Sequence, residues 1–566
     1  MVNKNIKTKY IFVSGGVLSG LGKGVCAASI GFLLENRGYK IGVIKCENYL
    51  NVDSGTINPI EHGDAFLCED GLEADMDLGT YERFLNREMG HRNFTTMGQI
   101  YKTVIDRERS FGYNGEDVEA IPHISDEIIA RIQEAGQDNE IIIIELGGTA
   151  GEYQNMLYYE ACRIMKAELP GQVLNVHVSY VPLPAHIGEP KTMPTQLSMR
   201  TVMSMGILPE FLVLRSAATL DKRRRYLLGL KTSVPGDNVI MAPDLDSIYE
   251  LPLLFAKQEF DKKILKYFKL HLKTPRLGEW AKLIKKIKIQ KNKSINIVIA
   301  GKYISTGDYE LYDSYAALIE AIKHACWHLN LNLNLRFVNT EDIEKEGSKL
   351  IGKPDGLIVP IGWGHRGAEG KISAIRYARE KKIPYLGLCY GMQLACVEFA
   401  RHVVGLSDAN SVEINPETKN PIIHDIPMDT RYQVIKGEGT SMRLGAYDCY
   451  LLENSQAGRI YLKAGEGRLL SEVQKKNAKI KAKGSIKISE RHRHRYEFNN
   501  DYREILEDNG LIISGTSADD FFVEMIELPK KMHPFFIATQ GHPEYKSKPL
   551  HPHPIFIEFL KAGLKK

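Results

Sequence analysis

Short runs of β-branched and other apolar residues alternate with stretches of helical length through most of this chain. A first series of such runs comprises Tyr10–Val13, Lys40–Lys45, Glu140–Glu145, Val173–Val178 and Phe211–Leu214. A second series comprises Ile295–Ala300, Leu333–Val338, Gly356–Val359, Pro384–Leu388 and Phe535–Thr539. Because short apolar runs separated by helices are typical of buried parallel strands, the chain is predicted to be α/β, with helices on both faces of its sheets.

The lysine-rich stretch between the two series contains Pro275 and Gly278 and is interpreted as a linker. At 566 residues the chain is long enough for two large domains. We predict a first domain over 1–270, a linker over 271–294 and a second domain over 295–566. Another lysine-rich stretch, Gln474–Lys487, has few large apolar residues and is predicted to be a solvated loop insertion, with a regulatory or partner-binding role as the alternative.

Composition restricts the classes of function. Hydrophobic residues make up 43% and charged residues 25%, as in soluble globular proteins, and the net charge is only +4, which does not favour a nucleic acid partner. The longest apolar runs, such as Ile141–Ile144, are far shorter than a membrane span, and the basic start lacks a signal-peptide core. The eight cysteines include no C-x-x-C pair. We therefore expect a cytoplasmic protein without a zinc site or disulfide framework.

A glycine-rich loop follows the first predicted strand. It contains Gly15-Gly16 and Gly20-Leu21-Gly22-Lys23-Gly24, and a predicted helix follows. Glycines let backbone N–H groups turn toward an anion, while the helix N-terminus and a lysine add positive charge. The loop departs from the usual P-loop, because Val17 stands at the first glycine and Gly24 at the metal-binding Ser or Thr. It predicts a phosphate site, and the alternative is an ordinary strand-to-helix turn that contains a lysine.

Two carboxylates are candidates for the metal ligands that this loop lacks. Asp77 lies in Glu73-Ala-Asp-Met-Asp-Leu-Gly79, and Glu145 ends an apolar run just before Leu146-Gly147-Gly148-Thr149. A carboxylate at the carboxyl end of a buried strand, beside a phosphate loop, is where doubly wound sheets place magnesium ligands. Each residue alone is equally compatible with a solvated loop or strand-end carboxylate.

A cysteine in the second half has the sequence setting of a nucleophile. Cys389 lies in Gly387-Leu-Cys-Tyr-Gly391, between a predicted strand and a predicted helix. The small flanking residues permit a tight turn that exposes the sulfur. Downstream, His542 and Glu544 follow the last predicted strand and can act as base and orienting carboxylate. The turn that begins at Gly362 can supply N–H groups for an oxyanion. The alternative for Cys389 alone is a buried structural cysteine.

These features, in this order, resemble the CTP synthase family. The resemblance extends over nearly the whole chain. It includes Asn51-Val-Asp, Tyr81-Glu-Arg-Phe84, Ile121-Pro-His-Ile124, Lys191-Thr-Met-Pro-Thr-Gln196, Asp246-Ser-Ile-Tyr249, Met442-Arg-Leu-Gly445 and Arg491-His-Arg-His-Arg-Tyr-Glu497. It implies a P-loop-like, doubly wound parallel-sheet synthetase (amidoligase) domain, followed by a class I glutamine amidotransferase α/β domain.

The resemblance implies a glutamine-dependent ligase. One half would release ammonia from glutamine, with Cys389 as nucleophile, His542 as base and Glu544 as its orienting partner. The residues expected to hold glutamine are Gly362, Tyr390, Gly391, Met392, Gln393, Glu413 and Arg495. The other half would use ATP and Mg²⁺ to phosphorylate O4 of UTP, and ammonia would displace the phosphate to give CTP.

In the synthetase half, Lys23 would stabilise the transferred charge, and Asp77 and Glu145 would hold Mg²⁺. The remaining residues expected at ATP are Gly20, Leu21, Gly22, Gly24, Val25, Pro243, Asp244 and Leu245. Those expected at the acceptor nucleotide are Ser19, Glu152, Tyr153, Gln154, Lys191, Thr192, Met193, Pro194, Thr195, Gln196 and Leu227. The resemblance also implies a homotetramer in which a neighbouring subunit completes the acceptor site, with GTP as an activator and CTP as an inhibitor.

Several positions depart from the family pattern. Met193 and Leu227 stand where lysines are usual, and Gln154 replaces an acidic residue. In the second half, Ile361 replaces the first of two glycines and Gly541 replaces an aromatic residue. Losing two charges from a triphosphate site leaves two alternatives to the family reaction open. One is a related ligase that aminates a different acceptor, and the other is a non-enzymatic nucleotide sensor or scaffold. Arg223, Arg224 and Arg225 are nearby in sequence and can replace the missing charge.

Overall fold

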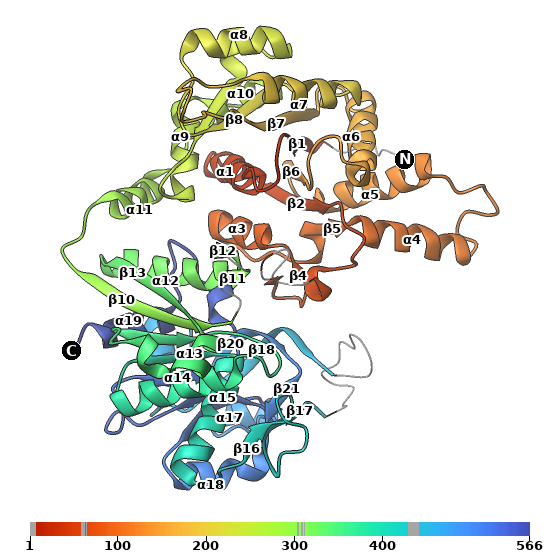
Figure 1. Ribbon diagram of the computed structural model, residues 1–566. Coiled ribbons are helices and arrows are strands. Elements are labelled where there is room, and N and C mark those ends of the chain that lie inside the picture. The colour runs from red at the N-terminus through yellow and green to blue at the C-terminus, as the bar shows by residue number, and fades with distance from the viewer. Residues whose placement is uncertain are drawn as a thin grey trace. The chain divides into compact units, whose positions relative to one another are not determined.

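The computed structural model describes residues 7–57, 63, 65–302, 305–306, 309–310, 312–427 and 441–565 (Figure 1). Residues 1–6 of the basic start lie outside this set. The chain forms two compact units, of which the first contains the described parts of Met1–Ile57 and Ala74–Ile287. The second contains those of Asn58–Glu73 and Lys288–Lys566. A short segment from the first half of the sequence thus belongs to the second unit. The domain boundaries proposed from the sequence stay a prediction.

The first unit is built on a seven-stranded sheet in which every neighbouring pair is parallel. The strand order is β5-β2-β6-β1-β7-β8-β9. The bounds are β1 Lys9–Gly15, β2 Ile41–Glu47, β5 Phe94–Thr96, β6 Ile141–Leu146, β7 Val173–Tyr180, β8 Phe211–Ser216 and β9 Val239–Pro243. All five runs of the first series are strands of this sheet, so the predicted α/β class is confirmed.

Helices cover both faces of this sheet (Figure 1). Alternate strand residues such as Phe12 and Ile144 pack in one core with helices α4, α5 and α6, whereas Ile143 on the opposite face contacts Gly31 of α1. The helices of the unit are α1 Lys23–Asn36, α3 Met76–Leu85, α4 Met97–Arg109, α5 Ser125–Ala135, α6 Met156–Glu168, α7 Met193–Ser204, α8 Lys222–Thr232, α9 Leu251–Lys257, α10 Phe260–Tyr267 and α11 Gly278–Lys288. The last of these lies within the predicted linker.

The second unit is built on a ten-stranded mixed sheet of order β13-β10-β14-β15-β24-β23-β22-β18-β20-β19. Its first five strands are parallel and match the second predicted series. They are β13 Asn332–Asn339, β10 Ser294–Gly301, β14 Gly356–Val359, β15 Tyr385–Leu388 and β24 Phe536–Thr539. The other five continue the sheet in antiparallel fashion, an extension that the apolar runs did not predict. They are β23 Val523–Glu527, β22 Ile512–Thr516, β18 Arg443–Leu451, β20 Ile486–His494 and β19 Arg468–Leu469.

Two hydrophobic cores lie on the two faces of this sheet. One packs α14 and α15 against Val359 and Ala538, and the other packs α12 and α19 against Ile358 and Ile537. The helices are α12 Ala316–Leu329, α13 Thr340–Glu346, α14 Ala368–Lys381, α15 Tyr390–Phe399, α16 Gln456–Ala464, α17 Glu472–Asn477, α18 Arg503–Asp508 and α19 Pro554–Gly563. A small sheet of β16 Ala409–Ser411, β17 Asn420–Asp425 and β21 Tyr496–Phe498 adjoins them.

The prediction of a solvated loop over Gln474–Lys487 is only partly right, because residues 478–485 form turns and loop whereas both ends of the stretch are regular structure. This stretch contains most of α17 and the start of β20. Lys475 is nearly buried and donates a hydrogen bond to the carbonyl of Lys483, and the Lys481 N–H donates to the carbonyl of Ala518. The lysines therefore surround a short packed element. Among the helices that the structure describes, none is long and apolar enough to cross a membrane.

Candidate functional site

Cys389 lies at the junction between β15 and α15, in a backbone conformation that is rare for a residue with a side chain. Its φ is 52° and its ψ is −104°. The tight turn requires both flanking glycines. A Cβ on Gly391 would overlap the carbonyl oxygen of Val359, and one on Gly387 would lie 2.6 Å from the Tyr385 hydroxyl. Strained backbone of this kind persists where the fold imposes it, often at functional sites. The predicted nucleophile elbow is therefore present in the fold.

His542 and Glu544 follow β24, the strand next to β15. His542 Nδ1 and Glu544 Oε1 are 2.7 Å apart, and both side chains are buried. Burial opposes the imidazolium, but Glu544 and the sulfur of Cys389 outweigh it and raise the pKa of His542 to about 10. His542 Nε2 is buried and has no hydrogen-bond partner among the described residues. The three predicted residues are thus electrostatically coupled in one buried site.

Most residues predicted to hold glutamine surround the same elbow. The Gly364 N–H donates to Glu413 Oε1 at 2.6 Å, and the Tyr390 hydroxyl donates to the Gly364 carbonyl at 2.9 Å. Arg495 contributes its charge near Glu413, where burial is nevertheless the main influence and raises the carboxyl pKa. The Gln393 amide donates to the carbonyl of Tyr496, while Met392 and Gly391 are buried in the first turn of α15.

The segment Ala65–Glu73 supplies further partners to this unit. Arg493, whose carbonyl oxygen lies 3.7 Å from Cys389 Sγ, forms a buried ion pair with Glu73 at 2.6 Å. The neighbouring Arg491 donates to the carbonyl of Leu67 at 2.8 Å. The Tyr545 ring, which stacks on His542, also donates from its hydroxyl to the carbonyl of Ala65. The backbone around the catalytic candidates is therefore held partly by residues encoded far upstream.

In the first unit, the glycine-rich loop connects β1 to α1. Val17, Gly20 and Gly22 all have positive φ, so Val17 adopts a left-handed conformation where the usual pattern has glycine. Lys23 is nearly buried, and its ammonium donates to the carbonyl of Gly148 at 2.8 Å, which brings the loop to the end of β6. Ser19 and Gly20 are exposed, whereas Leu21 and Gly24 are buried. This loop geometry is compatible with the predicted phosphate site.

Asp77 and Glu145 converge beside this loop. Lys45, at the end of β2, contacts Asp77 Oδ2 at 2.5 Å and Glu145 Oε1 at 2.7 Å, and the Tyr81 hydroxyl also donates to Glu145. Although burial alone would raise the pKa of Asp77, the charge of Lys45 outweighs it and lowers that pKa. Burial and the charge of Asp77 raise the pKa of Glu145 to about 6. Lys45 was missed in the sequence, although a lysine ending an apolar strand was a usable signal.

No cluster of three or more His, Cys, Asp or Glu side chains suited to a metal occurs within the described ranges. The two carboxylates alone still fit magnesium, which is commonly held by one or two carboxylates together with substrate phosphates. Their oxygen donors are of the type that this ion prefers.

The residues predicted at the adenine lie beside the same loop. Asp244, which follows β9, forms an ion pair with Arg215 at 3.0 Å. Arg215 Nε in turn lies 3.9 Å from where a Cβ on Gly22 would be. Pro243 ends β9 and is half-buried, and Leu245 follows in the loop.

The residues predicted at the acceptor are distributed over several elements. Glu152 accepts from Asn48 at 2.8 Å and from the Thr149 N–H at 2.7 Å, while Tyr153 and Gln154 are exposed. Helix α7 approaches the phosphate loop, because a Cβ on Gly16 would overlap the Ser198 hydroxyl.

At the start of α7, Thr195 and Gln196 are buried, Pro194 and Met193 are the first residues, and the Gln196 amide donates to Thr192. Met193 and Leu227, the departures from lysine, are 57% and 44% exposed, and Lys191 pairs with Glu189. The side chains of Met193 and Leu227 are therefore exposed to solvent in this structure.

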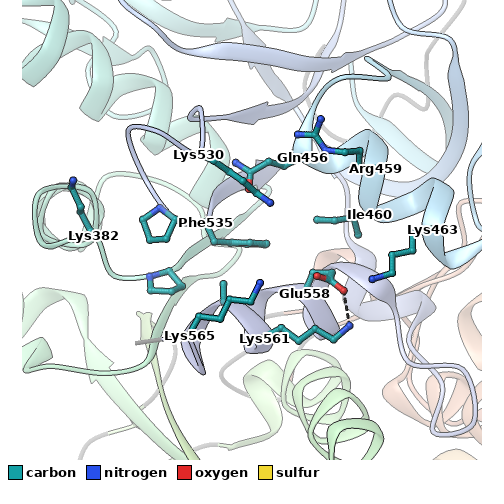
Figure 2. Close-up of a pocket in the computed structure, with 13 residues that line it drawn as sticks. Lys382, Gln456, Arg459, Ile460, Lys463, Lys530, Phe535, Glu558, Lys561 and Lys565 are labelled. Carbon is teal, nitrogen blue, oxygen red and sulfur yellow. Dashed lines mark hydrogen bonds and ion pairs between the residues drawn. The ribbon is translucent and has the colours of Figure 1, made fainter.

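A separate cavity of about 290 Å³ lies in the second unit (Figure 2). Pro384 and Phe535 line it and immediately precede β15 and β24, so the cavity lies at the amino ends of these strands. The catalytic candidates follow the carboxyl ends of the same strands. Lysines and one arginine surround the cavity, and its Glu558 is paired with Lys561 at 2.6 Å. It is therefore distinct from the candidate active site.

The two units together define a glutamine-dependent amidoligase, in which one α/β unit carries a cysteine elbow and the other a phosphate loop with paired carboxylates. Residues 9–270 match the family model described as CTP synthase N-terminus, and residues 310–562 match the model for class I glutamine amidotransferase. The chain belongs to the CTP synthase family.

Relatives match the chain over almost its whole length. The CTP synthase of Pyrococcus furiosus is 43% identical over 558 residues, which cover 98% of each chain. That of Bdellovibrio bacteriovorus is 43% identical over 564 residues, which cover 99% of this chain and 100% of the relative. A solved glutaminase domain of Trypanosoma brucei CTPS with bound acivicin is 34% identical and covers 48% of this chain and 95% of its own, with a TM-score of 0.41.

The protein is accordingly a ligase that forms a C–N bond and makes CTP with glutamine as nitrogen donor and ATP as energy source. The predicted family and reaction are confirmed. Nothing in these comparisons favours the alternative of a different acceptor, in spite of Met193 and Leu227.

Proposed function

We propose that glutamine is hydrolysed by a triad of Cys389, His542 and Glu544 in the second unit, and that ATP is used at Lys23, Asp77 and Glu145 in the first. The observation that carries the first assignment is the convergence of a strained Cys389 with the buried His542–Glu544 pair. The second assignment is supported by Lys45, whose contacts bring Asp77 and Glu145 together beside the phosphate loop.

In the glutaminase reaction, Cys389 Sγ attacks the amide carbon of glutamine, and His542 carries a proton to the departing ammonia. A glutamyl thioester and ammonia result. Water then attacks the thioester, so that glutamate leaves and Cys389 is regenerated. Glu544 holds the imidazole ring and stabilises its charge, which the raised pKa of His542 supports. Gly362, Tyr390, Gly391, Met392, Gln393, Glu413 and Arg495 are the proposed glutamine contacts.

In the synthetase reaction, the γ-phosphoryl group of ATP moves to O4 of UTP, and ammonia then displaces phosphate to give CTP. Lys23 is proposed to stabilise charge on the transferred group, which its position at the end of the glycine-rich loop supports. Asp77 and Glu145 are proposed to hold Mg²⁺, which when bound neutralises phosphate charge. Gly20, Leu21, Gly22, Gly24, Val25, Pro243, Asp244 and Leu245 are the remaining proposed ATP contacts.

The acceptor nucleotide is proposed to lie against residues from three parts of the first unit. They are Ser19, then Glu152, Tyr153 and Gln154, and finally Lys191, Thr192, Met193, Pro194, Thr195, Gln196 and Leu227. Of the arginines that can replace the missing lysines, Arg224 pairs with Asp221. Arg225 Nε is buried without a hydrogen-bond partner among the described residues, which supports Arg225 as the replacement.

We further propose that the chain acts as a cytoplasmic homotetramer that GTP activates and CTP inhibits, as its family membership implies. The eight cysteines are buried and form no disulfide bond among the described residues, which is compatible with a reducing compartment.

The test uses purified protein with ATP, Mg²⁺, glutamine and UTP, and separates the nucleotides by chromatography. We expect CTP formation that Cys389→Ala abolishes with glutamine and that added ammonia restores. Lys23→Ala should remove CTP formation with either nitrogen source while leaving the sulfur of Cys389 reactive. Unchanged CTP formation from glutamine in Cys389→Ala would contradict the assigned nucleophile.

A further inference from the structure

Lys371 is a fully buried amine that no step above uses. It is the fourth residue of α14 and has no exposed surface. Its ammonium nitrogen lies 5.1 Å from the centre of the Tyr390 ring, which immediately follows Cys389. A lysine is almost never fully buried unless it is paired, so its position here requires an explanation.

The partners of Lys371 are two successive backbone carbonyls of the loop after β14. Nζ donates to the Pro360 oxygen at 2.8 Å and to the Ile361 oxygen at 3.1 Å. The same nitrogen would lie 2.7 Å from a Cβ on Gly362, so the amine packs directly against this glycine. Ile361, one of the departures from the family pattern, is itself buried in the core and anchors the loop from its other side.

This contact determines the direction of the next N–H group. The peptide bond between Ile361 and Gly362 is planar, and the cis bond among the described residues is Ile121–Pro122. In a trans peptide the N–H points opposite to the C=O. With the Ile361 carbonyl held by Lys371, the Gly362 N–H points away from the amine. No described residue accepts a hydrogen bond from this N–H, which leaves it available to a ligand.

The helix that carries this amine is also held firmly. A Cβ on Gly370 would overlap the carbonyl oxygen of Thr340, so α14 packs closely on α13 at the residue before Lys371. Burial, followed by the charge of Lys302, lowers the pKa of Lys371 well below its usual range. The charges of Cys389 and Glu413 act on the same amine in the opposite sense, which places it beside the candidate site.

We propose that Lys371 is a positioning residue of the glutaminase, which fixes the peptide that directs the Gly362 N–H at the amide oxygen of glutamine as negative charge develops there. This inference rests on the proposed glutaminase site. Lys371 touches neither the sulfur nor the substrate, and it acts through the two carbonyls. Because an N–H aimed at the developing charge favours the transition state over the bound substrate, its loss lowers kcat more than it raises KM.

The test compares Lys371→Met with wild type in the full-length protein. Methionine keeps the length of the side chain and removes both donors. We expect kcat for glutamate release to fall about 10–100-fold and KM for glutamine to change less than about threefold. This fall in kcat is no larger than the roughly 10²–10³-fold fall that follows the loss of one oxyanion-hole donor. Alkylation of Cys389 by iodoacetamide displaces iodide and forms no oxyanion, so its rate should be unchanged. CTP formation from added ammonia should also be unchanged.

Lys381→Met is the matched control, because Lys381 is an exposed lysine at the end of the same helix. Lys371→Gln is the second variant. It keeps two N–H donors on a shorter arm, so its kcat should lie between those of wild type and Lys371→Met.

Three results would overturn the role of Lys371. They are a kcat within threefold of wild type, a raised KM with unchanged kcat, and a parallel loss of iodoacetamide labelling in both variants, which would indicate a structural role. A wild-type protein that released no glutamate from glutamine would instead overturn the glutaminase assignment on which the inference rests.

Discussion

A carboxylate oxygen of Asp77 lies in the space that a side chain on residue 24 would need. The phosphate loop therefore has glycine where the usual pattern has Ser or Thr, because an acidic side chain from α3 already occupies that position. The glycine at position 24, which departs from the usual pattern, is therefore required by Asp77, the carboxylate predicted to hold the metal.

Gly24→Ala should therefore displace Asp77 and damage the synthetase reaction alone. We expect CTP formation from ATP, UTP and ammonia to fall at least tenfold, while glutamate release from glutamine stays within twofold of wild type. Paired assays of the two half-reactions measure this. Gly278→Ala serves as a control, because no atom lies within 4 Å of its added Cβ. Retention of full ammonia-dependent activity in Gly24→Ala would show that Asp77 can move without consequence.

Glu544→Gln should lower the pKa of His542 and slow glutamine hydrolysis. Loss of an orienting carboxylate in comparable triads costs about 10⁴-fold in kcat, and we expect a fall of 10²–10⁴-fold. The pKa of His542 is raised to about 10, above the unfolded value of about 6.5. Its contribution to stability is thus complete below pH 6.5 and is lost as the pH rises through 10. The variant should be less stable than wild type at pH 6 and approach it near pH 10, as urea unfolding can measure.

His533 should make the second unit sensitive to acid. Its Nε2 lies 3.1 Å from the Ala378 carbonyl and its Nδ1 accepts from the Phe535 N–H, so a neutral ring satisfies both contacts. Burial lowers the pKa of His533 to about 4. Between pH 6.5 and 4 the unfolded chain binds a proton that the folded chain excludes, so stability falls as the pH falls.

In His533→Gln this slope should be smaller by up to about 1.4 kcal/mol per pH unit. Urea unfolding at pH 7, 6 and 5 measures the slope. The exposed His551, replaced in the same way, should leave it unchanged. Identical slopes for His533→Gln and wild type would contradict the exclusion of the proton.

Glu73→Gln should destabilise the second unit, although residue 73 lies in the first half of the sequence. It removes one partner of a buried ion pair and leaves Arg493 charged, which typically costs about 3–5 kcal/mol. Hydrogen exchange of peptides that cover β20 and β24 should accelerate, whereas peptides of β1 and β6 should not change. The double variant Glu73→Gln/Arg493→Gln removes the charge that Glu73 balanced and should recover part of the loss. Unchanged exchange in β20 would contradict this coupling.

Ten of the parallel strands were predictable, because most of them are apolar runs buried on both faces; the short β5 and β9 at the two edges of the first sheet were not predicted. The antiparallel half of the second sheet was not predicted either. Strand β20 carries Arg491, His492, Arg493 and His494 in buried positions, where distant residues contact them: Glu73 pairs with Arg493, and Glu524 contacts His492. Such partners leave no local pattern in the sequence.

The residues of the candidate sites likewise divide into those that were predicted from the sequence and those that were not. Cys389, His542 and Lys23 were found because their chemistry has short local signatures. Lys371 was not, because a lysine in a helix acquires a role only from the groups that the fold brings to it, and Lys45 was overlooked in spite of its position near the end of an apolar strand. The α17 helix at the start of the lysine-rich stretch was missed, although Ser471 and Gln474 form a capping box, which is a local signal.

The ion pair between Glu73 and Arg493 joins residues 420 positions apart. A ribosome that adds about 5–20 residues per second completes Arg493 roughly 20–80 s after Glu73. For that time the segment around Phe66 has left the ribosome without the strand that will cover it. The first unit can fold during synthesis, but the glutaminase can be completed only near the end of translation. The glutaminase is therefore completed after the chain of the first unit has left the ribosome.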